Sequence, residues 1–103
     1  MEQLKSSWPF DAPPDSSVVT SSYVTAKGLP ILEVSHEDDE EEGSLWQFHC
    51  GNGDFDSTVL QLVRFDEIVR LDPGLVEVAA LQRGFQATRA SKAAPWVFAP
   101  ADS

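Results

Sequence analysis

The sequence predicts an α+β fold: a single small domain in which a mostly antiparallel sheet carries one or two short helices. Three observations lead to this prediction. The chain has 103 residues, the length of one domain. Segments rich in β-branched and aromatic residues recur along it between short turn signals. An Asp-Pro-Gly sequence at residues 72–74 is typical of a helix start. We expect an extended N-terminal arm over residues 1–17, the α+β domain over 18–99 and a C-terminal tail over 100–103.

The strands of this sheet are predicted from β-branched and aromatic density. The stretch 58–63 fits either a buried strand or the first turn of a helix, because its short apolar run has no decisive period. The remaining expected strands cover residues 18–25, 31–36, 45–50, 84–89 and 95–98.

Two helices are expected before the last pair of strands. Residues 66–71 have the pattern of a short helix. Asp72 then offers an acceptor to the free backbone N–H groups of a second helix, and Pro73 fits its first position, where no donor is needed. We expect this second helix to run through Leu75 and Val78 and to stop before Gly84.

The N-terminal arm combines prolines with large aromatic residues. Pro9, Pro13 and Pro14 favour an extended chain, because proline removes backbone donors. Trp8 and Phe10 are apolar residues in this otherwise polar segment. We expect both rings to fold back over the core, where they leave water.

Side-chain alternation predicts the register of a central hairpin. Successive residues of a strand point to opposite faces, so a one-residue slip would place Val34 opposite Gln47. Matching apolar residues with each other avoids this. The expected opposed pairs are Val34 with Phe48, Leu32 with Cys50, and His36 with Trp46.

The charge balance excludes several classes of partner. Seventeen acidic residues against seven basic ones give a net charge of −10, which repels nucleic acid and anionic membranes. No apolar run reaches the length of a membrane span, and the N-terminus lacks the apolar run of a secretory signal. The single cysteine, Cys50, forms no internal disulfide. We therefore expect a cytoplasmic protein.

An acidic run at residues 37–42 is the candidate binding segment. It is expected to form a solvated hairpin loop, or alternatively an interaction surface for a basic partner. It lacks the spacing of an EF-hand calcium loop. The candidate binding residues are Glu37, Asp38, Asp39, Glu40, Glu41 and Glu42, together with the adjacent His36 and Trp46.

No catalytic constellation is predicted. His49 and Cys50 are neighbours on one strand and point to opposite faces, so they do not form a nucleophile and base pair. His36 and His49 also fall on opposite faces, which makes a zinc site with Cys50 geometrically poor. Cys50 is expected in the core beside Phe48. We accordingly expect no catalytic residue, no metal ligand and no cofactor.

Several short motifs resemble a known family. They are Val-Ser-His at residues 34–36, Trp-Gln-Phe at 46–48 followed by Cys50-Gly51, Leu-Asp-Pro-Gly-Leu at 71–75 and Pro95-Trp96. This pattern is similar to a family of small bacterial domains of unknown function, some of which are classed as immunity proteins of polymorphic toxin systems. The resemblance covers most of the chain and implies a compact α+β bacterial domain with a toxin-binding role.

These observations together predict a non-enzymatic bacterial binding protein. Its most specific form is an immunity-like protein that binds a basic, toxin-like partner through the acidic hairpin. Two alternatives stay open: a small metal-dependent or hydrolytic enzyme that uses His36 and nearby acids, and a scaffold that dimerises through a sheet edge. A monomer and a homodimer are both compatible with the sequence.

Overall fold

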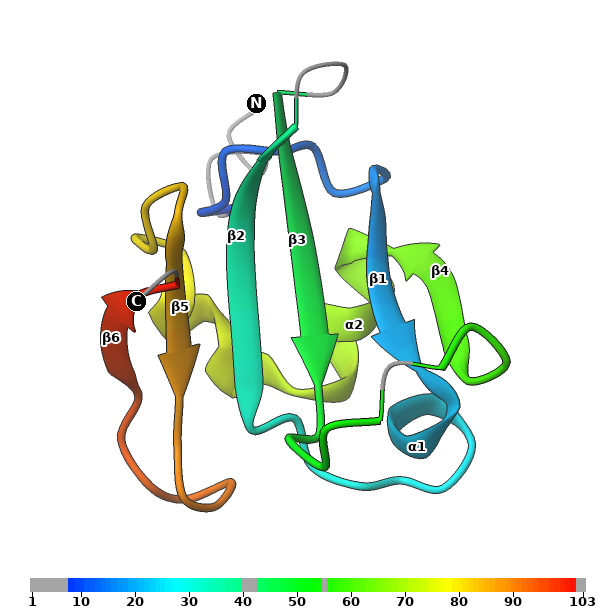
Figure 1. Cartoon of the computed structure of the whole chain (residues 1–103). Coiled ribbons are helices and arrows are strands. Elements are labelled where there is room, and N and C mark those ends of the chain that lie inside the picture. Colours follow the sequence, from blue (N-terminus) through cyan, green and yellow to red (C-terminus); the bar gives the residue numbers. More distant parts are fainter. Residues whose placement is uncertain (1–7, 40–42, 55, 102–103) are drawn as a thin grey trace.

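The computed structural model describes residues 8–39, 43–54 and 56–101 (Figure 1). It confirms the α+β class. The elements in chain order are β1 (Ser17–Ser21), α1 (Ser22–Thr25), β2 (Glu33–Asp39), β3 (Gly43–His49), β4 (Leu60–Arg64), α2 (Phe65–Leu71), the 3₁₀ helix η2 (Pro73–Val78), β5 (Phe85–Thr88) and β6 (Val97–Pro100).

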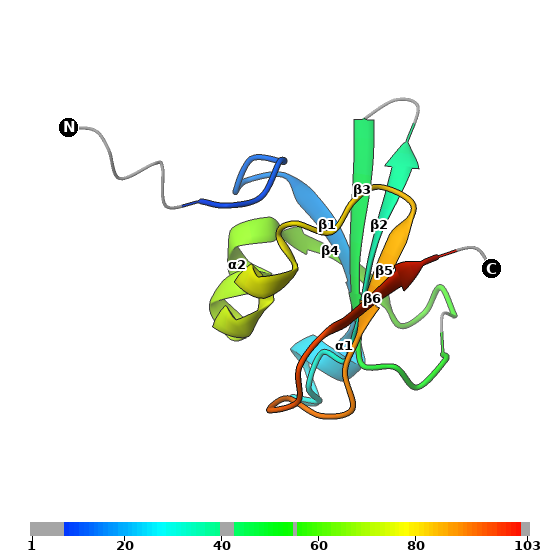
Figure 2. The ribbon, with the colours of Figure 1, turned by 90° about the vertical axis from the view of Figure 1, so that its left-hand side faces the viewer.

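The strands of the described chain form one six-stranded sheet in the order β4-β1-β3-β2-β5-β6. β1 and β3 run parallel, and the other neighbouring pairs run antiparallel. Figure 2 shows that α2 and the described part of the N-terminal arm, from residue 8 onward, lie on the same side of the sheet. We call this side the covered face and the opposite side the open face.

The central hairpin has the predicted register. Val34 lies opposite Phe48 and His36 lies opposite Trp46. The ladder begins with Glu33 opposite His49, so the predicted pair of Leu32 with Cys50 lies just outside it. The N–H of Leu32 donates to the carbonyl of His49. The paired side chains of Val34 and Phe48 are buried in the core on the covered face.

The hairpin strands extend further than predicted. Glu37, Asp38 and Asp39 belong to β2 and not to the loop expected over residues 37–42. Asp38 lies opposite Ser44 and Asp39 opposite Gly43, so no like charge faces these acids across the ladder. Glu40, Glu41 and Glu42 lie outside the described residues.

The chain leaves the sheet earlier than predicted after β1. Residues 22–25 form the helical turn α1 and not the second half of a strand. The N–H of Ser22 still donates to the carbonyl of Val59 in the adjoining chain, and the N–H of Ala26 then closes the turn on Ser22. This turn buries Val24 in the core, a contact that β-propensity alone does not reveal.

The helix predicted to start at Asp72 is a shorter 3₁₀ helix. The carboxylate of Asp72 accepts the N–H of Gly74 at 3.1 Å, which confirms the predicted cap. The helix ends at Val78 and not near Gly84. Beyond it the chain returns to the sheet, where the carbonyl of Leu81 accepts a hydrogen bond from the ring of His36. Residues 58–63, left open between strand and helix, contribute the strand β4.

The arm packs on the core as predicted. Phe10 is 6% exposed, and its ring centroid lies 4.5 Å from that of Phe65 and 5.3 Å from that of Trp46. The indole N–H of Trp8 donates to the carbonyl of Ala12 at 2.6 Å, which closes the arm on itself. The aromatic cluster therefore joins the arm, the sheet and α2.

A buried ion pair joins three separate segments. The guanidinium of Arg89 donates to the carboxylate of Asp72 at 2.5 Å and to the carbonyl of Ile31 at 2.7 and 2.9 Å. It also donates to the carbonyl of Lys92 and lies 4.2 Å from the ring centroid of Trp96. Four of the five N–H donors of the guanidinium group thus have an acceptor within the protein.

Replacing Arg89 is expected to destabilise the fold strongly. The substitution Arg89→Met leaves the buried carboxylate of Asp72 without its cation, and we expect a loss of about 3–5 kcal/mol in the free energy of unfolding. Arg64→Met is the matched control, because Arg64 forms an exposed pair with Asp66. Urea unfolding should show a much smaller change for this control. Equal losses in the two variants would contradict the role of burial.

Candidate functional site

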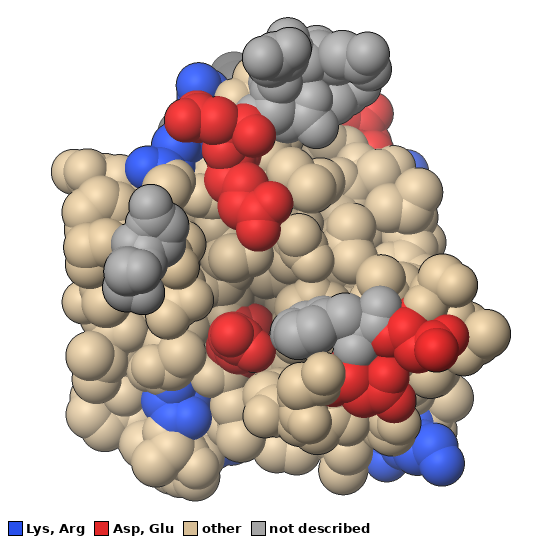
Figure 3. Space-filling view, viewed as in Figure 1, with Lys and Arg blue, Asp and Glu red and all other residues tan. Residues whose placement is uncertain are grey.

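The open face is hollowed at its centre, as Figure 3 shows. The hollow has a volume of about 410 Å³. Most of its lining residues project from the central strands β2 and β3, and the others come from β4, β5 and the segment after β6. They are Glu33, Ser35, Glu37, Gln47, His49, Leu60, Gln86 and Ala101. The open face therefore presents a concave and mainly polar surface.

A chain of hydrogen bonds fixes the side chains across this hollow. The Nε2–H of His49 donates to Oε1 of Gln47 at 2.9 Å, and the amide nitrogen of Gln47 donates to Oε2 of Glu37 at 3.3 Å. The hydroxyl of Ser35 lies 3.5 Å from the same carboxylate oxygen. Glu37 is thus contacted by donors from both strands, which restrict its orientation.

His49 is the titratable base of this network. Its side chain is 6% exposed, and burial lowers the pKa of the imidazole below its ordinary value of 6.5. The neutral ring is therefore favoured, which matches its role as a donor to the amide oxygen of Gln47.

The acids of the hollow are not neutralised by the described basic residues. Glu33 lies opposite His49 in the ladder, and within the described chain neither Glu33 nor Glu37 has a Lys or Arg within 4 Å. Arg64 and Arg89 are paired with other acids. Figure 3 shows acidic side chains over the upper end of β2, in the hollow and over the loop after β3.

The acids of the loop after β3 have structural partners. The hydroxyl of Tyr23 donates to Asp54 at 2.6 Å, and this hydrogen bond raises the pKa of the tyrosine. The backbone and hydroxyl groups of Thr58 donate to Asp56, which lowers the pKa of that carboxyl. These two acids shape the loop, so the carboxylates of Glu33 and Glu37 are the better candidates for binding.

The sequence-predicted binding residues do not meet on one surface. Glu37 lines the hollow on the open face. Asp38 points to the other side of the hairpin, where its side chain is 78% exposed and lies 3.9 Å from Arg83. Of the remaining acids, Asp39 ends β2, and Glu40, Glu41 and Glu42 lie outside the described residues.

His36 and Trp46 lie on the covered face and are buried. The rings stack with centroids 3.9 Å apart. The Nδ1–H of His36 donates to the carbonyl of Leu81 at 2.7 Å, and its Nε2 lies 3.5 Å from the carboxylate of Asp11. The indole of Trp46 donates to the same carboxylate at 3.3 Å. This cluster fastens the N-terminal arm to the hairpin, and both rings are buried in it.

The arrangement is suited to binding cationic groups. In residues 8–39, 43–54 and 56–101 no group of three or more His, Cys, Asp or Glu side chains is placed to hold a metal ion. Cys50 is buried and is not among the residues that line the hollow. Carboxylates on a concave polar surface attract ammonium or guanidinium groups.

The predicted binding residues do not include Glu33, Ser35, Gln47 and His49. Strand alternation could nevertheless have identified them as a set, because it places them together on the face opposite Val34 and Phe48. The concavity itself depends on β5 and on segments distant in sequence.

Acidification is expected to destabilise the protein partly through His49. Unfolded His49 has its ordinary pKa, so between about pH 7 and about pH 5 it binds a proton more readily than the buried ring does, and the free energy of unfolding falls. His49→Gln keeps a donor for Gln47 and removes this titration. Urea unfolding at both pH values should show a smaller fall for the variant. An identical pH dependence in the two proteins would contradict the role of His49.

The comparisons with known proteins give no relative from which a function could be proposed. No family model, curated protein or solved structure matches the chain. The resemblance to immunity proteins therefore stays a prediction. Within the described residues, no helix has the length and apolarity needed to cross a bilayer.

Proposed function

We propose that this protein is a non-enzymatic binding protein that receives a basic protein partner on its open face. The observation that carries the proposal is the hollow, in which the carboxylates of Glu33 and Glu37 lie among polar side chains without a cationic partner in the described chain. The single unpaired Cys50 supports a location in the cytosol.

The uncovered sheet face alone does not support this function, because antiparallel sheets commonly leave one face to water. The relevant property is the orientation of the Glu37 carboxylate, which hydrogen bonds hold. Glu37 accepts hydrogen bonds from Gln47 and Ser35, so it loses little side-chain entropy when a cation binds. A lysine or arginine side chain entering the hollow meets this held carboxylate, and Glu33 offers a second carboxylate elsewhere in the same hollow.

Net charge supports rapid association with such a partner. The chain carries a net charge of −10, and Glu37, the first residue of the acidic run, lines the hollow. The electrostatic field of these negative charges steers a basic protein toward the open face before the two proteins touch. The proposed partner is therefore a basic protein, and the resemblance to immunity proteins supports a toxin as its specific form.

The alternative as an enzyme that uses His36 has weaker support. The His36 side chain is 4% exposed, and it is held between Trp46, Asp11 and the carbonyl of Leu81. A substrate has no access to this ring in the described arrangement.

The proposal predicts a charge-specific loss of binding. Glu33→Gln should weaken the binding of a fluorescent arginine-rich peptide about fivefold, as expected for one ion pair of about 1 kcal/mol. It should also reduce the dependence of affinity on salt. Fluorescence anisotropy at two salt concentrations measures both effects.

Glu77→Gln is the matched control, because it removes the same charge from an exposed residue of η2. Its affinity should stay close to that of the wild type. Equal weakening in both variants would show non-specific attraction by net charge and contradict a role for the hollow.

For the toxin form, co-expression with the product of the neighbouring open reading frame should give a stable complex and relieve toxicity. Failure of both would refute that form.

A further inference from the structure

β4 lies at an edge of the sheet with unused backbone groups. Its ladder with β1 pairs Val19 with Leu62. Hydrogen bonds from Ser22 to Val59 and from Phe65 to Ser16 bracket this ladder. Since hydrogen-bonded pairs alternate in antiparallel strands, the N–H and C=O groups of Leu60, Leu62 and Arg64 point away from β1. Within the described chain no further strand pairs with them.

The opposite edge, formed by β6, is less suited to pairing. The N–H of Ala101 donates to the carbonyl of Gly84. The same alternation therefore directs the backbone groups of Phe98 and Pro100 to the free edge. Pro100 has no N–H, which interrupts the donors of this edge. The strand β4 contains no proline.

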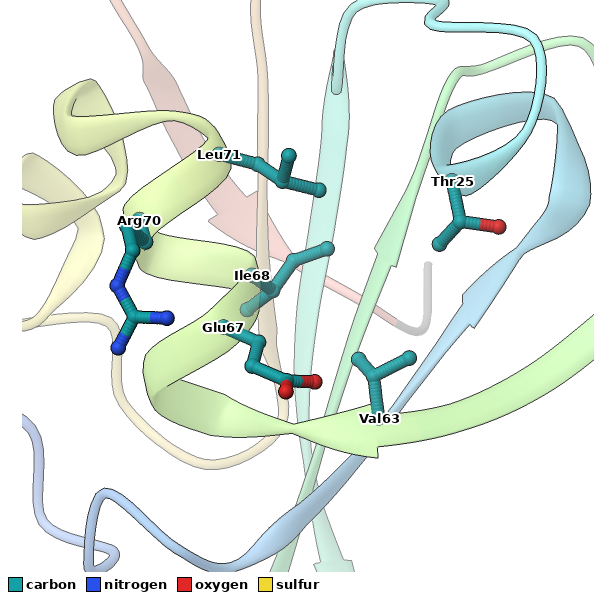
Figure 4. A pocket seen from close by; sticks show the side chains of 6 residues that line it. All are labelled: Thr25, Val63, Glu67, Ile68, Arg70 and Leu71. Atoms are coloured by element: carbon teal, nitrogen blue, oxygen red, sulfur yellow. The ribbon is translucent and has the colours of Figure 1, made fainter.

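Apolar side chains flank the β4 edge on both faces of the sheet. Leu62 is 69% exposed on the open face. On the covered face, Figure 4 shows Val63, Ile68 and Leu71 directed toward a groove that Thr25 borders from the other side. This groove has a volume of about 320 Å³, and Leu71 is 57% exposed. Leu62 and the groove thus flank the outward backbone groups of β4, with which no other strand of the described chain pairs.

The sequence of β4 is complementary to itself. An antiparallel pair of β4 strands centred on Leu62 places Leu62 opposite its own copy, Gln61 opposite Val63 and Leu60 opposite Arg64. No like charges face each other in this register. In this register the two copies hydrogen-bond to each other through the backbone N–H and C=O groups of Leu60, Leu62 and Arg64. These are the groups that point away from β1. The groove carries one acid and one base, Glu67 and Arg70, so this region lacks the net negative charge that keeps other faces apart.

We propose that two copies of this chain associate through β4, in antiparallel pairing about a twofold axis at Leu62. Their two six-stranded sheets then form one continuous sheet. The twofold axis is perpendicular to the sheet, so both open faces lie on the same side. This interface is separate from the proposed binding of a basic partner, and either can fail without the other.

The test is the mass of the full-length chain in solution over a wide range of concentration, measured by sedimentation equilibrium. The wild type should approach twice 11.3 kDa as concentration rises. Leu62→Lys places two ammonium groups on the axis and should raise the dissociation constant about tenfold or more. The matched control is Val97→Lys on β6, where the side chain is 61% exposed, and it should dimerise like the wild type.

Leu62→Cys tests the register without a new charge. The pairing brings the two Cα atoms at position 62 to about 5.5 Å, within the reach of a disulfide. Oxidation should therefore give a covalent dimer on a non-reducing gel, and Val97→Cys should give none. A wild type that is monomeric at every concentration, a dimer that Leu62→Lys leaves intact, or equal cross-linking at both edges would each overturn the proposal.

Discussion

The ion pair of Asp72 and Arg89 fixes the relative position of three segments that are distant in sequence. Through it the start of η2, the entry into β2 at Ile31 and the connection between β5 and β6 are joined at one buried point. Burying two charges is unfavourable unless further hydrogen bonds satisfy them, and here the backbone carbonyls do so. The entry into β2 sets which of its residues reach the open face. The geometry of the hollow therefore depends on this pair.

Local patterns predicted the parts of the fold that depend on neighbouring residues. Alternation identified the pairing of Val34 with Phe48, and the Asp72 cap was read from its own short motif. The errors occurred where distant contacts decide the conformation. Val24 has strand composition but enters the core through a helical turn. Asp38 belongs to a charged run, yet it continues β2 because Ser44 lies opposite it.

The candidate site was only partly predictable for the same reason. Glu37 was selected for its charge and does line the hollow, whereas His36 and Trp46 were selected for their proximity in sequence and are buried on the other face. One residue of separation in a strand reverses the side to which a side chain points. Neighbours in sequence are therefore poor guides to a shared surface in a sheet, and Glu33 and His49, sixteen residues apart, are directly opposed.

Pro100 determines how far pairing between sheet edges extends. A sheet with two competent edges adds a new copy at each side and grows into a fibre. Because Pro100 removes a donor from β6, association through β4 uses the competent edge of both copies and leaves two blunted ends. Such an assembly is closed at a fixed stoichiometry, and the high negative charge of the chain keeps these closed units dispersed.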